Sequence, residues 1–323
     1  MNKELKILGI VAAFTLVLYW GVEPFAHSQM HKHVEGHGLV YDGTADIEEA
    51  SKDKKEAKKA FWADVKTIAA LKGDATAGEA TFAMCAGCHM DGAANMGGVT
   101  PPSLDHAGAI YDKNFLIALI KDPAMATNVD HKYPNGTMTH PMGSISSMVS
   151  APQDIANVVA YLKAKKAGEV TAKEAYVEAC SRCHANRYGK LTQLGEKPKT
   201  KSNIKTGLDI DAMKFAQKVA TEQGALAEYL GKLPPDLSIM FRARNEHFLH
   251  TFIENPQANL AGTAMPRTGL NEEGMEKVME YLAETGDPSA PARAMAGPWV
   301  LGFFFLFTIL AYLWKQSQWR DLH

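Results

Sequence analysis

The chain has 323 residues, of which 46% are hydrophobic and 22% are charged, and its formal net charge is −2 at pH 7. These ordinary fractions exclude an intrinsically disordered chain, and the length suits about two domains. A nucleic-acid-binding protein carries a basic surface, so the nearly neutral balance excludes a nucleic-acid partner.

The N-terminal stretch 1–26 is predicted to be a membrane anchor. Lys3 and Lys6 precede an uncharged apolar run at 7–22. This run approaches the length of about 20 residues that a membrane span needs. The residues after it form a poor signal-peptidase site, which requires small side chains. We expect a retained helix with both lysines on the cytoplasmic side, and a cleaved signal peptide is the alternative.

Residues 27–72 are predicted to contain a His-rich segment and a charged helix. The histidines are His27, His31, His33 and His37. Their irregular spacing favours a polar segment at the membrane surface or against a partner over a metal or haem-ligand site, which needs fixed geometry. The run from Ile47 to Leu71 predicts one helix, and its second half has an apolar stripe at helical spacing. The stripe consists of Phe61, Trp62, Val65, Ile68, Ala69 and Leu71.

All four cysteines lie in two copies of one motif, Cys85-Ala86-Gly87-Cys88-His89 and Cys180-Ser181-Arg182-Cys183-His184. C-x-x-C-H is the attachment signature of c-type haem. A redox C-x-x-C needs no His, and a zinc site needs more ligands. The motifs predict two covalently bound haem c groups, with thioethers at the four cysteines and His89 and His184 as proximal iron ligands. Bacteria attach this haem outside the cytoplasmic membrane, so the middle of the chain is expected there.

The segments around the two motifs repeat. Thr76, Glu79 and Ala80 before the first motif recur at Thr171, Glu174 and Ala175, at an offset of 95 residues. After the motifs, 101–104 recurs at 234–237 and 115–123 at 248–256, at an offset of 133. The sequence therefore predicts a duplicated domain. The second copy has 38 extra residues within 187–233, including a predicted helix at 211–229. Each copy is predicted to end in an apolar helix with Tyr-Leu, at 152–163 and 271–283.

This order of helix, C-x-x-C-H, Pro-Pro loop, helix, Met-containing loop and final helix resembles the class I cytochrome c family. The resemblance implies an all-α fold with two tandem class I cytochrome c-like haem domains. It also implies that the carbonyls of Pro102 and Pro235 orient the proximal histidines, and that a Met on the loop before the last helix is the sixth iron ligand. A thioether ligand raises the reduction potential.

The sixth ligand is clearer in the second copy than in the first. Met265-Pro266 stands 16 residues before Tyr281, at the usual place for the family, so Met265 is the candidate there. In the first copy Met142 is favoured, 19 residues before Tyr161. Met138, Met148 and a bis-His site with His140 stay open as alternatives.

The segment 233–239, LPPDLSI, followed by Arg242-Ala243-Arg244 resembles cytochrome c1, the haem subunit of the quinol–cytochrome c reductase (cytochrome bc1) complex. That subunit also ends in a membrane helix. Here a linker rich in Pro, Ala and Gly precedes an apolar run at 299–314, with Lys315 and Arg320 beyond it. Arg244 is the implied haem-pocket residue of this segment. The N-terminal stretch, both haem domains and the tail together resemble the di-haem cytochrome c subunit of bacterial bc1 complexes of the epsilonproteobacterial type.

The predicted organisation is an anchor at 1–26, the His-rich segment and charged helix at 27–72, haem domains at 73–167 and 168–284, a linker at 285–298, and a transmembrane helix with its tail at 299–323. The resemblance implies an electron relay in the inner membrane, with the haem domains in the periplasm. Its partners would be cytochrome b and the Rieske iron–sulfur protein, then a soluble cytochrome c or a terminal oxidase. An independent di-haem carrier, an oxidase subunit and a di-haem peroxidase are the alternatives. Two haems leave open which one receives the electron, and the cytochrome c1-like segment favours the second.

Overall fold

The computed structural model describes residues 3–31, 38, 40–90, 99–132, 140, 142–165, 169–198 and 209–320. In these ranges the chain is helical except for loops and one antiparallel hairpin, β1 (Leu191–Thr192) and β2 (Gly195–Glu196). The all-α class predicted from the sequence is confirmed. The histidines His33 and His37, and the side chains of His27 and His31, lie outside the described part.

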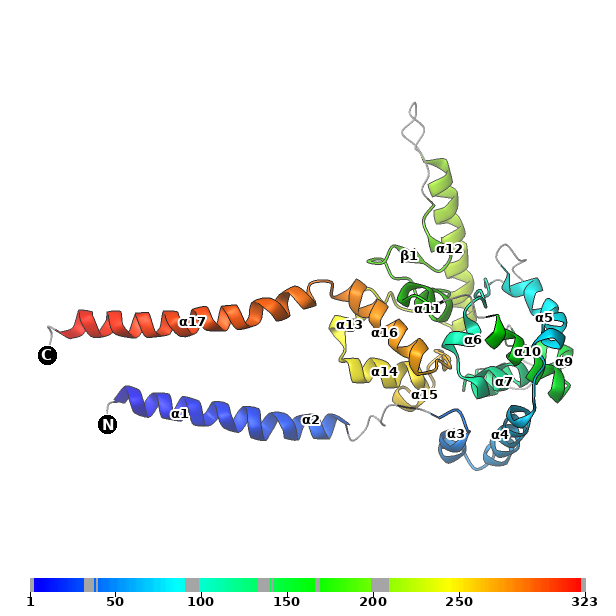
Figure 1. The fold of residues 1–323 in the computed structure, drawn as a ribbon, viewed down its shortest axis with the longest axis horizontal. Helices are drawn as coiled ribbons and strands as arrows, with labels where there is room; N and C mark the ends of the chain where they lie inside the picture. Colours follow the sequence, from blue (N-terminus) through cyan, green and yellow to red (C-terminus); the bar gives the residue numbers. More distant parts are fainter. Residues whose placement is uncertain are drawn as a thin grey trace.

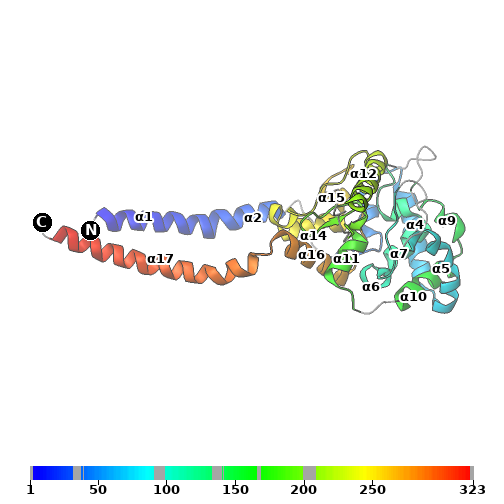
Figure 2. The same cartoon turned by 90° about the horizontal axis from the view of Figure 1, so that it is seen from above.

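Two long helices leave the same side of a helical body (Figures 1 and 2). At the N-terminus α1 (Lys3–Val17), the π-helical turn η1 (Leu18–Val22) and α2 (Glu23–His31) run on without a break. At the C-terminus α17 spans Ala290–Trp319. The segments Lys3–Ala26 and Ala290–Trp319 are long and apolar enough to cross a membrane, and neither is covered by the rest of the chain. The two ends of the chain lie together, and Lys315 pairs with Glu4 there.

The segment expected as a single helix from Ile47 to Leu71 is two helices, α3 (Thr44–Glu49) and α4 (Lys55–Ala70). The chain turns at Ala50, whose ψ of 138° is extended. This turn folds α3 back onto α4, where the Trp62 indole donates to Asp46 Oδ2 at 2.8 Å. The tertiary contact between the buried Asp46 carboxylate and Trp62 thus outweighs the helical propensity of residues 50–54. The predicted apolar stripe of α4 is confirmed as part of the first core.

The first core is built by six further helices: α5 (Ala75–His89), α6 (Ala107–Ile110), α7 (Lys113–Lys121), α8 (Pro123–Ala126), α9 (Ile145–Met148) and α10 (Pro152–Ala164). Helices α5 and α10 cross at Gly78, where an added Cβ would lie 2.0 Å from the Asn157 carbonyl oxygen. Only glycine permits this approach. Beside the crossing, the rings of Phe82 and Tyr161 lie 5.1 Å apart between centroids.

The second core repeats this plan. It contains α11 (Ala172–Ala179), α13 (Met240–Ala243), α14 (Glu246–Glu254), α15 (Pro256–Asn259) and α16 (Glu272–Gly286). Helices α6, α7 and α8 recur as α13, α14 and α15 with every limit displaced by 133 residues, so the predicted repeat is confirmed in this part. Helix α11 packs on α16 as α5 does on α10, and the rings of Tyr176 and Tyr281 lie 4.7 Å apart. The predicted helix of the insertion is α12 (Ile210–Leu230), which projects from the body in Figure 1.

The two repeats are joined by backbone hydrogen bonds and by residues of the first repeat that are buried in the second core. Asn271 N donates to the Ile110 carbonyl at 2.9 Å, and Asp112 N donates to the Gly269 carbonyl at 2.9 Å. Ala109 and Ile110, from α6 of the first repeat, are buried in the second core. The relative position of the two C-x-x-C-H motifs is therefore set by packed backbone.

A fully buried ion pair joins the N-terminal segment to the second repeat. The Arg267 guanidinium donates to both oxygens of Asp46, at 2.7 and 3.1 Å, and both side chains are 2% exposed. Arg267 also donates to Asn255 Oδ1 at 3.1 Å, and its backbone N donates to the Thr127 carbonyl at 2.9 Å. Because Arg267 follows Met265 by two residues, this pair holds the base of the Met265 loop.

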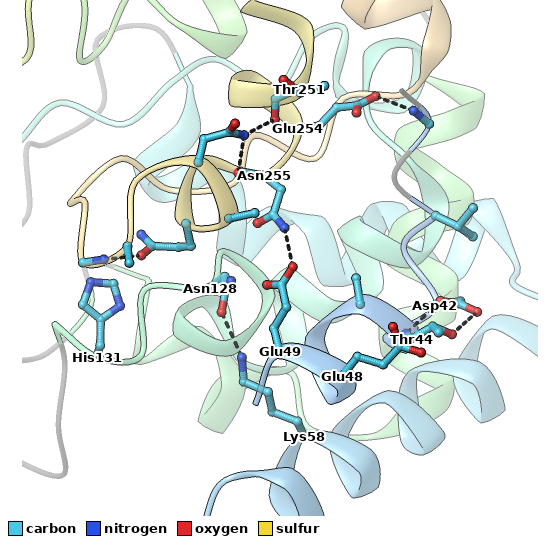
Figure 3. A pocket seen from close by; sticks show the side chains of 18 residues that line it. Asp42, Thr44, Glu48, Glu49, Lys58, Asn128, His131, Thr251, Glu254 and Asn255 are labelled. Carbon is cyan, nitrogen blue, oxygen red and sulfur yellow. Dashed lines mark hydrogen bonds between the residues drawn. The ribbon is translucent and has the colours of Figure 1, made fainter. Parts of the chain in front are cut away.

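A polar cavity of about 910 Å³ lies next to this pair, between α3, α4 and the α14–α15 region (Figure 3). Asn255 donates to Glu49 Oε1 at 3.4 Å across one side of it, and Lys58 donates to Asn128 Oδ1 at 2.9 Å on another. No residue of either C-x-x-C-H motif and neither methionine candidate lines the cavity. It therefore belongs to the junction of the N-terminal segment with the repeats.

Residues 290–297, which composition predicts as part of a linker, are helical and continuous with the apolar span. Proline in the first turn costs no hydrogen bond, because that N–H has no partner inside the helix. Pro291 stands in this turn, and the alanines around it favour helix. The body is thus joined to the span by a helix.

Candidate haem sites

The first motif lies at the C-terminal end of α5, whose first turn is capped by the Asp74 carboxylate. His89 Nδ1 lies 2.8 Å from the Pro102 carbonyl oxygen. A carbonyl only accepts, so Nδ1 carries the proton and the lone pair of Nε2 is free to bind a metal. Burial lowers the pKa of His89, which keeps the ring neutral, as ligation requires.

The second motif follows α11, which begins with a capping box between Thr171 and Glu174. The backbone makes one further turn, with His184 N donating to the Cys180 carbonyl at 2.9 Å. His184 Nδ1 donates to the Pro235 carbonyl, again at 2.8 Å. The same imidazole–prolyl arrangement therefore occurs at both motifs, and its role as the support of an iron ligand stays a prediction.

The Pro-Pro-Asp-Leu-Ser segment closes directly against the second motif. Leu237 N donates to the Ala185 carbonyl at 2.9 Å, and Tyr188 N donates to Ser238 Oγ at 3.1 Å. The Asp236 carboxylate accepts from the Arg187 backbone N at 3.2 Å. These bonds fix the Pro235 carbonyl relative to the residues that follow His184.

None of the four cysteines is part of a disulfide. Burial raises the pKa of Cys85, that of Cys180 to about 12 and that of Cys183 to about 11; the Glu222 carboxylate adds to the shift at Cys183. Two cysteines one helical turn apart, followed by a neutral imidazole held by its Nδ1, fit covalently bound haem c at each motif. Such a group supplies one-electron redox chemistry at its iron when bound.

Met265 and Met142 are both half-buried on loops before the last helix of their repeat. Met265 N donates to Thr263 Oγ1 at 3.3 Å, and the loop is anchored at Arg267 as described above. Met142 N donates to His140 Nδ1 at 3.1 Å. His140 is neutral, because burial lowers its pKa to about 4, and an accepting Nδ1 places its proton on Nε2. This tautomer is unsuited to ligation through Nε2, which favours Met142 over His140.

Of the other predicted residues, Met138 lies outside the described part, and Met148 is 52% exposed in α9. Arg244 is exposed at the end of α13, with its guanidinium carbon 5.6 Å from the centroid of the Phe248 ring. The structure gives Arg244 this cation–π contact, and its haem-pocket role stays a prediction.

Replacing Met142 by Leu should remove the ferric sulfur-to-iron absorption band of the first haem, because leucine offers no thioether. The band of the second haem should remain. The measurement is the absorption spectrum of the oxidised, haem-loaded protein. The exposed Met148, replaced in the same way, is the control. An unchanged spectrum in Met142→Leu would contradict the assignment and favour Met138.

Sequence reasoning missed a buried carboxylate between the two motifs. Glu178 stands two residues before Cys180, and its Oε2 accepts from His106 N at 3.0 Å, with His106 Nδ1 3.3 Å away. His106 follows the Pro-Pro loop of the first repeat. Loss of solvation on burial raises the pKa of Glu178 to about 7, and the nearby Asp105 adds a smaller rise. A lone Glu in an amphipathic helix gives no signal of such a contact, because the contact depends on how the repeats pack.

Glu178 should make the stability of the protein depend on pH. Its pKa is higher in the folded than in the unfolded state, so the folded state holds the proton more tightly. The loss of stability caused by ionising the buried Glu178 is absent below about pH 4.5. It grows as the pH rises and reaches on the order of 3 kcal/mol above pH 7. Glu178→Gln should therefore raise the free energy of unfolding at pH 8 and flatten its pH dependence. Denaturant unfolding at pH 5, 6, 7 and 8 measures this, with exposed Glu79→Gln as the control. An unaltered pH dependence in Glu178→Gln would refute it.

The chain is similar to known proteins over part of its length. A protein 25% identical over 193 residues is the ammonia monooxygenase gamma subunit of Nitrosomonas europaea; the match covers 46% of this chain and 80% of that protein. A solved chain of a hyperthermophilic respiratory complex III is similar with a TM-score of 0.37 and 25% identity, over 49% of this chain and 78% of that chain. The cytochrome c family model matches residues 75–166. These residues therefore form a cytochrome c domain, which implies covalently bound haem c and electron transfer.

Proposed function

We propose that this chain is the membrane-anchored di-haem cytochrome c subunit of a bacterial cytochrome bc1 complex. It relays electrons from the Rieske iron–sulfur protein to a soluble cytochrome c or a terminal oxidase. The observation that carries the proposal is the duplication of the site: each C-x-x-C-H motif has its histidine Nδ1 2.8 Å from a prolyl carbonyl. The second site lies outside the matched cytochrome c domain, and its equal geometry supports a second haem c.

The choice of a bc1 subunit rests on the cytochrome c1-like segment and on the two anchors. The segment's Leu237, Ser238 and Asp236 close against the second motif by the hydrogen bonds given above. The relative from Nitrosomonas europaea is named as a gamma subunit, and a subunit is one part of a larger assembly.

The orientation follows from charge. Lys3, Lys6, Lys315 and Arg320 all belong to the end of the long helices that lies far from the body. Basic residues flank membrane helices on the cytoplasmic side. This end would therefore be cytoplasmic, with the body in the periplasm.

The body is layered along the same direction. In both views α14 and α16 lie near the long helices, whereas α5, α9 and α10 lie at the far end (Figures 1 and 2). Helix α11, which precedes the second motif, lies nearer the long helices than α5, which carries the first (Figures 1 and 2). This arrangement supports the second site as the receiver of electrons from a membrane-bound complex, with the first site as the relay. In this role the chain's own residues orient two imidazoles and hold the sites at a fixed separation. No residue acts as an acid, base or nucleophile.

Gentle solubilisation of the native membrane tests the proposal. The chain should copurify with a cytochrome b and a Rieske protein and should contain two haems c per polypeptide. Purification without either partner would overturn the bc1 assignment and leave an independent carrier or an oxidase subunit. Binding of carbon monoxide or peroxide to the untreated protein would instead indicate an open iron and favour a di-haem peroxidase.

A further inference from the structure

The insertion of the second repeat reaches across to the first haem site. Its helix α12 contains Glu222, which is 5% exposed although it carries a carboxylate. Glu222 Oε1 accepts from Thr100 N at 2.6 Å, and Oε2 accepts from Thr100 Oγ1 at 3.0 Å. Both carboxylate oxygens thus accept hydrogen bonds from Thr100, a residue of the first repeat. These bonds offset the cost of burying the carboxylate.

Thr100 lies two positions before Pro102 in the chain, with Pro101 between them. The Pro102 carbonyl accepts from Nδ1 of His89, the first proximal histidine. A rigid path therefore connects the Glu222 carboxylate to the imidazole of His89 through Thr100 and Pro102. Hydrogen-bonded groups behind a ligand fix its orientation and tune the metal.

The same stretch of α12 also contacts the second motif. Gln223 Nε2 donates to Gln193 Oε1 at 3.0 Å, and Gln193 Nε2 donates to the Cys183 carbonyl at 3.4 Å. Gln193, which links these two hydrogen bonds, is 1% exposed. Lys132 of the first repeat donates to the Leu230 carbonyl at 2.6 Å and fixes the C-terminal end of α12. Helix α12 is therefore attached by Glu222 to Thr100, beside the Pro-Pro loop of the first repeat, and by Gln223 through Gln193 to the second motif.

We propose that Glu222 is a positioning residue shared by the two haem sites, which holds the Thr100–Pro102 segment behind His89 and places one negative charge beside the second motif. This inference rests on the proposed function, because it requires haem at both motifs. It gives the insertion within 187–233 a role inside the chain.

The two effects of Glu222 can be separated by substitution. A buried negative charge favours the ferric form, which carries one more positive charge than the ferrous form. Glu222→Gln removes the charge and should raise the midpoint potentials of both haems. Thr100→Val keeps the charge and the backbone donor but removes the hydroxyl. It should alter the electron paramagnetic resonance g-values of the first ferric haem and leave those of the second unchanged.

The experiment is a spectroelectrochemical titration of the purified haem-loaded chain, with these spectra recorded on the oxidised samples. Glu228→Gln is the matched control, because Glu228 is an exposed glutamate on the same helix. Potentials of Glu222→Gln that move no further than those of Glu228→Gln would overturn the proposal. So would a Thr100→Val variant whose first-haem g-values match the wild type.

The haem content separates this test from that of the proposed function. A haemochrome assay that finds two haems per chain, with potentials indifferent to Glu222, refutes the inference alone. One haem per chain would refute the di-haem function and with it the inference. If Glu222→Gln loses haem during assembly, Thr100→Val decides the outcome, because it changes one hydroxyl and no charge.

Discussion

Asp46→Ala is expected to destabilise the protein by about 3–5 kcal/mol, because it leaves the Arg267 guanidinium buried without its counter-ion. Both side chains are 2% exposed, and Asp46 also accepts from the Trp62 indole. The substitution should therefore lower the midpoint of denaturant unfolding of the haem-loaded protein strongly. It should also weaken the ferric sulfur-to-iron band of the second haem, because Arg267 anchors the Met265 loop.

The control is an exposed ion pair between α4 and α7. Lys121 Nζ lies 2.9 Å from the Asp64 carboxylate, whose side chain is 61% exposed. Asp64→Ala should cost about 0–1 kcal/mol, as exposed pairs do. The double variant Asp46→Leu with Arg267→Met should recover part of the loss, because no buried charge remains. A small effect of Asp46→Ala, equal to that of Asp64→Ala, would contradict the importance of the pair.

Met265→His is expected to produce the largest change in redox behaviour. It replaces the thioether by an imidazole, which stabilises ferric iron better. The potential of the second haem should fall by an appreciable fraction of the roughly 0.8 V range that axial ligands span. The sulfur-to-iron band of that haem should disappear.

A redox titration of the whole chain measures both changes. Met142→His should give the same result at the first haem and leave the second unchanged, so each variant is the control of the other. Met148→His, at an exposed position, should alter neither haem. If Met265→His kept both the band and the potential of the second haem, another residue would have to be its ligand.

Much of the fold could be predicted because it depends on local pattern. The limits of α13–α15 follow α6–α8 by the offset read from Pro-Pro and Phe-Leu alone. The prediction of one helix over 47–71 was wrong, because Asp46 forms a buried ion pair with a residue 221 positions away and the turn at Ala50 serves that contact. No local pattern contains this information.

The residues of the candidate sites also differ in whether the sequence predicts them. The cysteines, both histidines and their prolines are fixed by spacing within one turn or one loop, so the sequence reveals them. Glu222, Glu178 and Arg267 act between repeats, and nothing in their own neighbourhood marks them.

The buried Asp46–Arg267 pair also constrains how the chain matures. The N-terminal half of the chain is synthesised first. Asp46 can form its ion pair only after Arg267, 221 positions later, has been synthesised. Contacts of such long sequence separation form late and slow folding. In the proposed orientation, Cys85 and Cys88 would be exported, and would be accessible to the haem-attachment machinery, while the first repeat still lacks Arg267 and Glu222. The final geometry at His89 would then be set only after the second repeat has folded, so maturation of the first site ends with the C-terminal half of the chain.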